Sequence, residues 1–167
     1  AGAPDIGPGG HGTDTTRPMR EAVVRHRAIA EQETRVETAW LEDAELVITA
    51  FGVLGRFARY AAQLARREGM RVGYVRPYTL VPFPYSTFAE IGARGIPVTV
   101  FENNAGQMVQ DVRLGVEGRA PVSFIGEISM DGSGFGVGPK IDALHILSRI
   151  REVYPGRSAA AAAEVER

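Results

Sequence analysis

Residues 44–78 read AELVITAFGVLGRFARYAAQLARREGMRVGYVRPY and contain three successive patterns. The first, Ala44–Phe51, is a continuous apolar run with β-branched residues, which is typical of a strand buried on both faces. In residues 53–70 the apolar side chains recur at helical spacing, and Gly69 ends that predicted helix. Residues 71–78 form a second apolar run. The three patterns together predict a right-handed βαβ unit.

The same alternation continues along the chain. Prolines on both sides of Phe83 predict a tight loop rather than a central strand, and a short helix follows, capped by Ser86 or Thr87 and ended by Gly95. The remaining expected elements are strands at Ile96–Glu102 and 120–128 and helices at Gln107–Val116 and 140–154. This order predicts an α/β domain with an open, mostly parallel sheet and helices on both faces.

We expect a single domain over residues 15–156. Residues 1–14 are rich in glycine and proline and are predicted to be a linker or loop, and residues 157–167 are predicted to be a flexible Ala-rich tail. Residues 19–42 predict a leading amphipathic helix. Its thin apolar stripe comprises Met19, Val23, Val24, Ile29, Val36 and Trp40.

Composition excludes several kinds of chemistry. The 167 residues are 44% hydrophobic and 23% charged, with a net charge of −1, which is a globular composition without a basic field for nucleic acid or an anionic membrane. The chain has no cysteine, so it cannot supply thiolate ligands or nucleophiles. Lys140 is the only lysine. With no targeting pattern and no membrane-spanning run, we expect a cytoplasmic protein.

The most prominent local motif is the glycine-rich segment Gly132–Gly138, ahead of Lys140 and the last helix. Backbone amides and a helix N-terminus can bind phosphate. However, the spacing matches neither the dinucleotide fingerprint nor the phosphate loop, and the segment follows the last strand instead of the first. A purely conformational loop is the favoured interpretation. The shorter Gly52–Gly55 motif is interpreted as close packing of a helix on a strand.

Other candidates for catalysis are weak. His145 falls on the apolar stripe of the last helix and is interpreted as a hydrogen-bonded core histidine. The stripe comprises Ile141, Leu144, His145, Leu147, Ser148 and Ile150. The carboxylates Glu42, Asp43 and Glu45 are typical of a solvated strand entry. We therefore predict no catalytic, cofactor-binding or metal-binding residue in this chain.

The segment 101–118, FENNAGQMVQDVRLGVEG, gathers polar residues where a strand ends and a helix begins. These are Glu102, Asn103, Asn104 and Gln107. In open α/β sheets, ligands and partners approach at this edge, so the four side chains are candidates for fixing a ligand or a neighbouring backbone. An Asn-rich turn with a helix cap explains the same residues. The sequence leaves both interpretations open.

Three segments in this order resemble one known family. They are LEDAELVI at 41–48, RPYTLVPFP at 76–84 and ENNAGQMVQDVR at 102–113. Their spacing is similar to that in the C-terminal region of the alpha subunit of 2-oxoacid:ferredoxin oxidoreductases, of the 2-oxoglutarate or branched-chain 2-oxoacid type. The resemblance runs from about His11 to about Tyr154. It implies a three-layer α/β/α sandwich on a mostly parallel sheet, like the transketolase C-terminal domain.

The resemblance also implies an activity for the whole complex, which is oxidative decarboxylation of a 2-oxoacid to an acyl-CoA. Thiamine diphosphate, magnesium, an iron–sulfur cluster and coenzyme A are implied for that complex, and none of them for this chain alone. The implied partners are the remaining alpha-subunit domain, the beta subunit and, indirectly, ferredoxin. Asp131-Gly132 lacks the preceding glycine and the downstream asparagine of a thiamine diphosphate site.

We therefore expect a catalytically silent domain that holds subunits together around the thiamine site. The expected subunit-contact or active-site-proximal residues are Arg76, Pro77, Thr79, Pro82, Phe83, Pro84, Glu102, Asn103, Asn104, Gly106, Gln107 and Met108. The alternative is a free-standing module that binds a nucleotide or coenzyme A through the Gly132–Gly138 loop. A truncated gene product without an independent role is a third possibility.

Overall fold

The structure is a computed structural model that describes residues 16–125, 129–130, 136–137 and 142–155. The predicted linker and tail lie outside these residues, as does most of the glycine-rich loop. The elements in chain order are α1 (Thr16–Glu33), β1 (Val36–Ala39), β2 (Leu46–Thr49), α2 (Gly52–Arg67), β3 (Val72–Pro77), α3 (Tyr85–Ala93), β4 (Val98–Val100), α4 (Met108–Gly115), β5 (Val122–Phe124), β6 (Ser129–Met130), β7 (Gly136–Val137) and α5 (Ala143–Val153).

The main sheet has the strand order β1-β3-β2-β4-β5. β2, β3, β4 and β5 run parallel, and β1 runs antiparallel to β3 at one edge. β6 and β7 pair separately as a short antiparallel ribbon. The predicted alternation of strands and helices and the mostly parallel sheet are confirmed.

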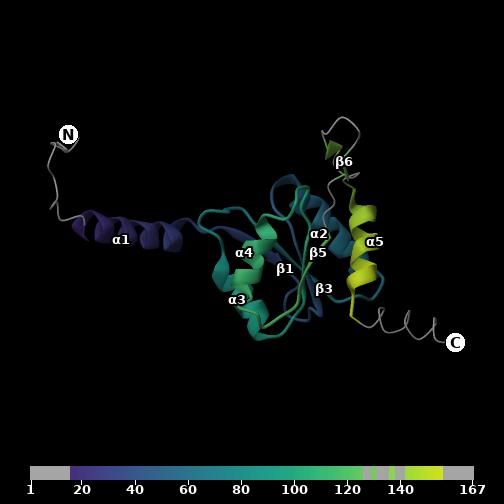
Figure 1. Ribbon diagram of the computed structural model, residues 1–167. Helices are drawn as coiled ribbons and strands as arrows, with labels where there is room; N and C mark the ends of the chain where they lie inside the picture. Colours follow the sequence, from purple (N-terminus) through teal and green to yellow (C-terminus); the bar gives the residue numbers. More distant parts are fainter. Residues whose placement is uncertain (1–15, 126–128, 131–135, 138–141, 156–167) are drawn as a thin grey trace.

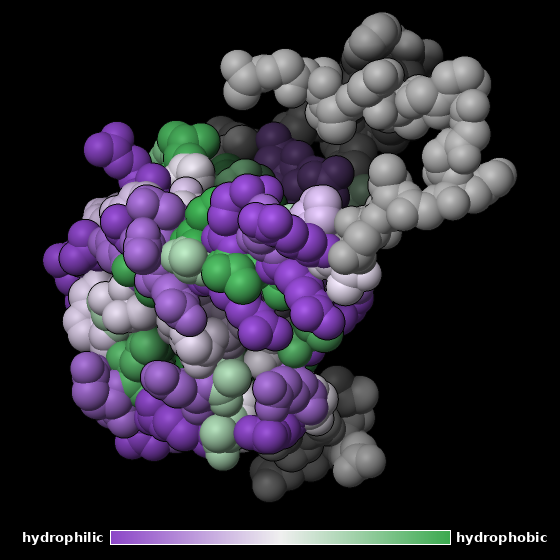
Figure 2. Space-filling model, turned by 90° about the vertical axis from the view of Figure 1, so that its left-hand side faces the viewer, coloured by the Kyte–Doolittle hydropathy of each residue, from purple (hydrophilic) through white to green (hydrophobic). Residues whose placement is uncertain are grey.

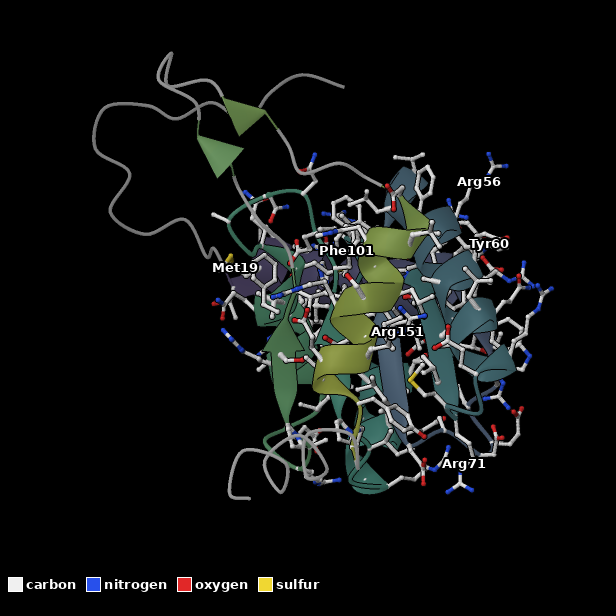
Figure 3. The ribbon with its side chains drawn as sticks, turned by 90° about the vertical axis from the view of Figure 1, so that its right-hand side faces the viewer. Met19, Arg56, Tyr60, Arg71, Phe101 and Arg151 are labelled. Atoms are coloured by element: carbon white, nitrogen blue, oxygen red, sulfur yellow. The ribbon has the colours of Figure 1, made fainter. Side chains whose placement is uncertain are left out.

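Helices cover both faces of this sheet, so the domain has three layers (Figure 1). Successive strand residues point to opposite faces. Leu46 and Ile48 therefore pack with α2 and α5, while Val47 packs with α3 and α4. Phe101, which follows β4, lies fully buried behind α5 in the first of these two cores (Figure 3). The expected three-layer sandwich is confirmed.

The leading helix is shorter than predicted. α1 ends at Glu33, and Val36–Ala39 is a strand whose residues pair with β3 in the register Val36 to Pro77. Side chains close the helix end, because the Thr34 hydroxyl donates to Ala30 O at 2.6 Å and the Arg35 guanidinium donates to Gln32 O at 2.5 Å. Pairing with the free edge of β3 outweighs the local helical pattern.

Three smaller expectations are also corrected. Pro84, and not Ser86 or Thr87, is the N-cap residue of α3. On α5, Leu144 is 67% exposed and Ile146 is buried, because the helix begins at Ala143 after an Asp142 cap whose carboxylate accepts from His145 N. The hydrogen-bonded core histidine expected at His145 is not found either, since His145 is only half-buried and its Nε2 has no hydrogen-bond partner among the described residues.

Arginines neutralise the carboxylates at the start of β2, as a solvated strand entry requires. Asp43 pairs with Arg66 at 2.7 Å, and this hydrogen bond holds the pKa of the Asp43 carboxyl below its usual range. Glu45 pairs with Arg71 and accepts a hydrogen bond from the Tyr154 hydroxyl. Tyr154 thereby ties the end of α5 to the sheet.

The antiparallel direction of β1 decides where α1 leaves the domain. Val36 lies beside Pro77, the last residue of β3, so α1 joins the sheet at the edge where the parallel strands end. We call this edge the carboxyl edge. α1 extends away from the body of the domain (Figure 1), and none of its residues is buried. Among the described residues, no helix combines the length and apolar character needed to cross a membrane.

A substitution in α3 tests the packing of α3 on α4. A Cβ added at Gly92 would come within 2.6 Å of the backbone oxygen of Val116. Although alanine favours helix more than glycine does, this backbone clash forces the two helices apart. We expect Gly92→Ala to lower the free energy of unfolding by about 1–2 kcal/mol in urea denaturation. Ser86→Ala, exposed on the same helix, should change it by less than about 0.5 kcal/mol.

Candidate functional site

β2 and β4 are parallel neighbours in the centre of the sheet, but the connections that follow them turn to opposite faces of it. After β2 the chain enters α2 on one face, and after β4 it enters α4 on the other. In open α/β sheets the ligand site usually lies at such a point, just beyond the strand ends. The predicted turn Glu102–Gln107 follows β4 at this point, so it lies where a ligand is expected.

A buried carboxylate organises this turn. Glu102 is 0% exposed. Its Oε2 accepts from the backbone N–H of Met108 at 2.8 Å, and its Oε1 accepts from that of Val109 at 2.8 Å. The N–H of Gln107 adds a longer bond of 3.3 Å. The carboxylate thus satisfies the free amides of the first turn of α4, where the helix dipole also favours a negative charge.

Asn104 completes the turn. Its side-chain oxygen accepts from Gly106 N at 2.7 Å and from Gln107 N at 3.3 Å, and its amide donates to Glu102 Oε2 at 3.2 Å. Gly106 has a φ of +92°, in the left-handed region that favours glycine. Asn103 and Gln107 are exposed, whereas Met108 is buried. Glu102 and Asn104 therefore form the capped turn of the second interpretation, while the exposed Asn103 and Gln107 remain candidates for contact with a neighbour.

This arrangement leaves little room for catalysis at the turn. The Glu102 carboxylate is fully enclosed and occupied by hydrogen bonds, so it cannot reach a substrate as an acid or base. It also occupies the helix N-terminus that could otherwise hold a phosphate. The site can position α4 and present Asn103 and Gln107 to a neighbour.

The loop Tyr78–Pro84, which follows β3, is the second part of the carboxyl edge. The Val81–Pro82 bond is cis. Phe83 anchors the loop, since its ring stacks on Phe88 with centroids 5.2 Å apart. Val81 is 86% exposed, and Leu80 and Tyr85 are also exposed. The loop therefore presents apolar side chains to solvent while its base is fixed in the core.

One hydrogen bond connects α3, which follows this loop, with α4, which follows the Glu102 turn. The Tyr85 hydroxyl donates to Asp111 of α4 at 2.7 Å, and this bond raises the pKa of the Tyr85 phenol above its usual value. A hollow of about 280 Å³ lies beside it and is lined partly by α1. The hollow's lining residues are His26, Ala30, Leu80, Val81, Pro82, Phe83, Tyr85 and Asp111. Figure 2 shows the side of the molecule from which α1 extends, and this side carries small apolar patches among polar side chains.

All of the predicted contact residues except Arg76 lie along the carboxyl edge. Nine of them lie in the Tyr78–Pro84 loop, in the Glu102–Gln107 turn or at the start of α4. These are Pro82, Phe83, Pro84, Glu102, Asn103, Asn104, Gly106, Gln107 and Met108. Thr79 joins the loop to the root of α1, because its hydroxyl accepts from Arg35 N at 2.9 Å. Pro77 is the last residue of β3. Arg76 alone lies on the opposite face of the sheet, packed on Gly55 of α2.

Sequence reasoning missed three contributors to this edge: Tyr85, Asp111 and α1 itself. The sequence predicts the leading helix but not its place relative to the sheet. The signal that could have placed it is the alternation Thr34-Arg35-Val36-Glu37-Thr38-Ala39, in which β-branched residues recur at every second position. This pattern is typical of a strand.

The residues do not fit the implied cofactors. An iron–sulfur cluster needs thiolate ligands, and the sequence contains no cysteine. In the described part of the chain, no three His, Asp or Glu side chains gather as metal ligands. At the point between the ends of β2 and β4, Glu102 occupies the helix N-terminus where a diphosphate would bind. No reaction step is therefore assigned to these groups on this chain.

Comparison with known proteins gives consistent matches. The sequence model described as "Pyruvate:ferredoxin oxidoreductase core domain II" matches residues 44–135. The chain is 35% identical over 129 residues to ketoisovalerate oxidoreductase subunit VorB of Methanothermobacter thermautotrophicus, covering 77% of this chain and 34% of that protein. It is 30% identical over 128 residues to 2-oxoglutarate synthase subunit KorA of Methanothermobacter marburgensis, covering 76% and 33%. The chain thus spans about a third of these relatives.

Two solved structures share the fold. A 2-oxoglutarate:ferredoxin oxidoreductase from Magnetococcus marinus superposes with a TM-score of 0.66 and 24% identity, over 90% of this chain and 24% of that one. A split-gene transketolase superposes with a TM-score of 0.55 and 19% identity, over 70% of this chain and 41% of that one. The expected likeness to the transketolase C-terminal domain is confirmed.

Substitutions at Glu102 test its structural role. Glu102→Ala leaves the buried amides of Met108 and Val109 without an acceptor, so we expect the free energy of unfolding to fall by about 3 kcal/mol. Glu102→Gln keeps one acceptor and should cost about 1–2 kcal/mol. Urea denaturation followed by circular dichroism measures both values.

Glu90→Gln on the exposed surface of α3 is the matched control and should change stability by less than about 0.5 kcal/mol. Equal effects of Glu102→Gln and Glu90→Gln would show that the Glu102 carboxylate does not hold α4.

Proposed function

Because the chain belongs to the pyruvate:ferredoxin oxidoreductase core domain II family, we propose that it acts as this domain in a 2-oxoacid:ferredoxin oxidoreductase. The complex would oxidatively decarboxylate a 2-oxoacid to an acyl-CoA and pass the electrons to ferredoxin. The curated relatives support this class, since they are named for ketoisovalerate and 2-oxoglutarate. Within such a complex this chain holds other subunits in place and carries out no chemical step.

The buried Glu102 is the observation that carries this proposal. At the position where an open α/β sheet usually binds a ligand, this carboxylate accepts hydrogen bonds from the chain's own amides at 2.8 Å. At this turn the carboxyl edge therefore offers an internally hydrogen-bonded surface in place of an open ligand site. Such a surface suits contact with another polypeptide.

The proposed partners are the remaining alpha-subunit domain and the beta subunit. The first is expected because the curated relatives are about three times as long as the matched part of this chain, and the second because those relatives are named as subunits. The apolar side chains at the carboxyl edge supply the contact area. They comprise Leu80 and Val81 on the loop, Tyr85 at the start of α3, and Met19, Val23, Val24 and Ile29 on α1. Burial of such side chains is a main driving force of protein association.

The cofactors of the reaction belong, in this proposal, to those partners. Thiamine diphosphate would supply the carbanion-stabilising chemistry of decarboxylation. This chain would contribute only the fixed backbone of the Glu102 turn and the Tyr78–Pro84 loop beside that centre.

Co-expression with the rest of the alpha subunit and the beta subunit of the same organism tests the docking surface. Val81→Asp places a charge at an 86% exposed apolar position, so it should weaken assembly at least about tenfold without unfolding the domain. Biolayer interferometry of the tagged chain against the partner subunits measures the affinity.

Leu144→Asp is the matched control, because Leu144 is 67% exposed on α5, in the opposite layer of the sandwich. It should leave the affinity unchanged. If both variants bind as tightly as the unaltered chain, the carboxyl edge is not the contact surface. If the 167-residue chain alone reduces ferredoxin in a 2-oxoacid-dependent way, the proposed non-catalytic role is wrong.

A further inference from the structure

A second hollow lies on the face of the sheet that α2 covers, between α2 and the strands β1 and β3. Its volume is about 380 Å³, within the range of small-molecule sites. Eight residues line it, and they are Glu37, Arg56, Arg59, Tyr60, Gln63, Tyr74, Arg76 and Tyr78. Arg56 and Tyr60 extend from the outer side of α2, away from α5 (Figure 3). The hollow thus lies on the α2 side of the sheet, and it shares Tyr78 with the loop of the proposed docking surface.

Arg76 is held in one orientation at the base of this hollow. Its aliphatic part packs on Gly55, where an added Cβ would come within 2.5 Å of the Arg76 side chain. Its guanidinium lies over the ring of Tyr78, with 4.8 Å from Cζ to the ring centroid. Its Nε is buried and has no hydrogen-bond partner among the described residues. A guanidinium fixed in this way loses little entropy when it binds an anion.

The charges in the hollow are unbalanced. Three guanidinium groups share one carboxylate, Glu37, which pairs with Arg59 at 3.2 Å and lies 3.8 Å from Arg76. The Tyr78 hydroxyl donates to the same carboxylate at 2.9 Å. Arg56 makes no ion pair with any residue that the structure describes. Two positive charges therefore remain in excess around a concave, arginine-lined space.

We propose that this hollow binds a phosphate group. A phosphate monoester carries close to two negative charges and three free oxygens, which matches two excess charges and guanidinium groups that approach from several sides. A carboxylate offers one charge and two oxygens, so it fits less well. The rings of Tyr60 and Tyr78 form walls beside the arginines and suit the organic part of a phosphorylated molecule.

Isothermal titration calorimetry of the 167-residue chain at low ionic strength tests the proposal with three probes: inorganic phosphate, phenyl phosphate and acetate. We expect one site for each phosphate probe and at least about tenfold weaker binding of acetate. Arg56→Gln, at an exposed position that the fold does not need, should weaken both phosphates about tenfold. Arg76→Gln should do the same, provided that circular dichroism shows the variant folded.

Tyr60→Ala distinguishes the two sources of phosphate. If it weakens phenyl phosphate alone, the natural ligand is an organic phosphate; if it changes neither probe, the site takes free phosphate. Arg113→Gln, exposed on α4 across the sheet, is the control and should change nothing. Absence of heat with both phosphates, acetate binding as tightly as phosphate, or an equal loss in Arg113→Gln would overturn the proposal.

Discussion

The position of α4 depends on a single buried carboxylate. Burying Glu102 costs free energy, and the cost is offset because both oxygens accept backbone N–H groups at the positive end of a helix. With the first turn of α4 fixed in this way, Met108, Val109 and Val112 cover the face of the sheet shared with α3. The same interaction also determines the charge at this point of the carboxyl edge. A negative charge supplied by the chain itself stands where many folds of this type hold a ligand's phosphate.

Sequence reasoning succeeded where burial alone determines structure. The continuous apolar runs at 46–49 and 98–100 predicted strands because both of their faces are covered, and no partner had to be identified. It failed at Val36–Ala39, because a half-exposed edge strand exists only through its pairing with β3, and that pairing is a long-range contact. The importance of Glu102 was predicted from its place after a strand. Its binding partners could not be predicted, since an N-capped turn and a ligand contact use the same residues.

The alternation of side chains along β3 divides one predicted set of residues between two faces. Val75 faces the core of α3 and α4, whereas its neighbour Arg76 faces α2. A linear motif such as Arg76–Pro84 therefore does not describe one surface. Arg76 and Tyr78 line the arginine-lined hollow, and the residues from Thr79 to Pro84 form the loop at the carboxyl edge. The domain thus presents two chemically different regions. The apolar loop is one continuous segment of the sequence, whereas the arginine-lined hollow is assembled from separate segments.

The antiparallel direction of β1 has a mechanical consequence. α1 has 18 residues, so it is a rod about 27 Å long, attached at the carboxyl edge through Thr34 and Arg35. A change of about 10° at this attachment would displace the far end of the rod by about 5 Å, which is close to one helical turn. The direction of α1 relative to the sheet is therefore set by a few hydrogen bonds. Thr34 and Arg35 bind the end of α1, and Arg35 binds Thr79. A small shift of Thr79 in the Tyr78–Pro84 loop would therefore move the far end of α1 by a larger distance.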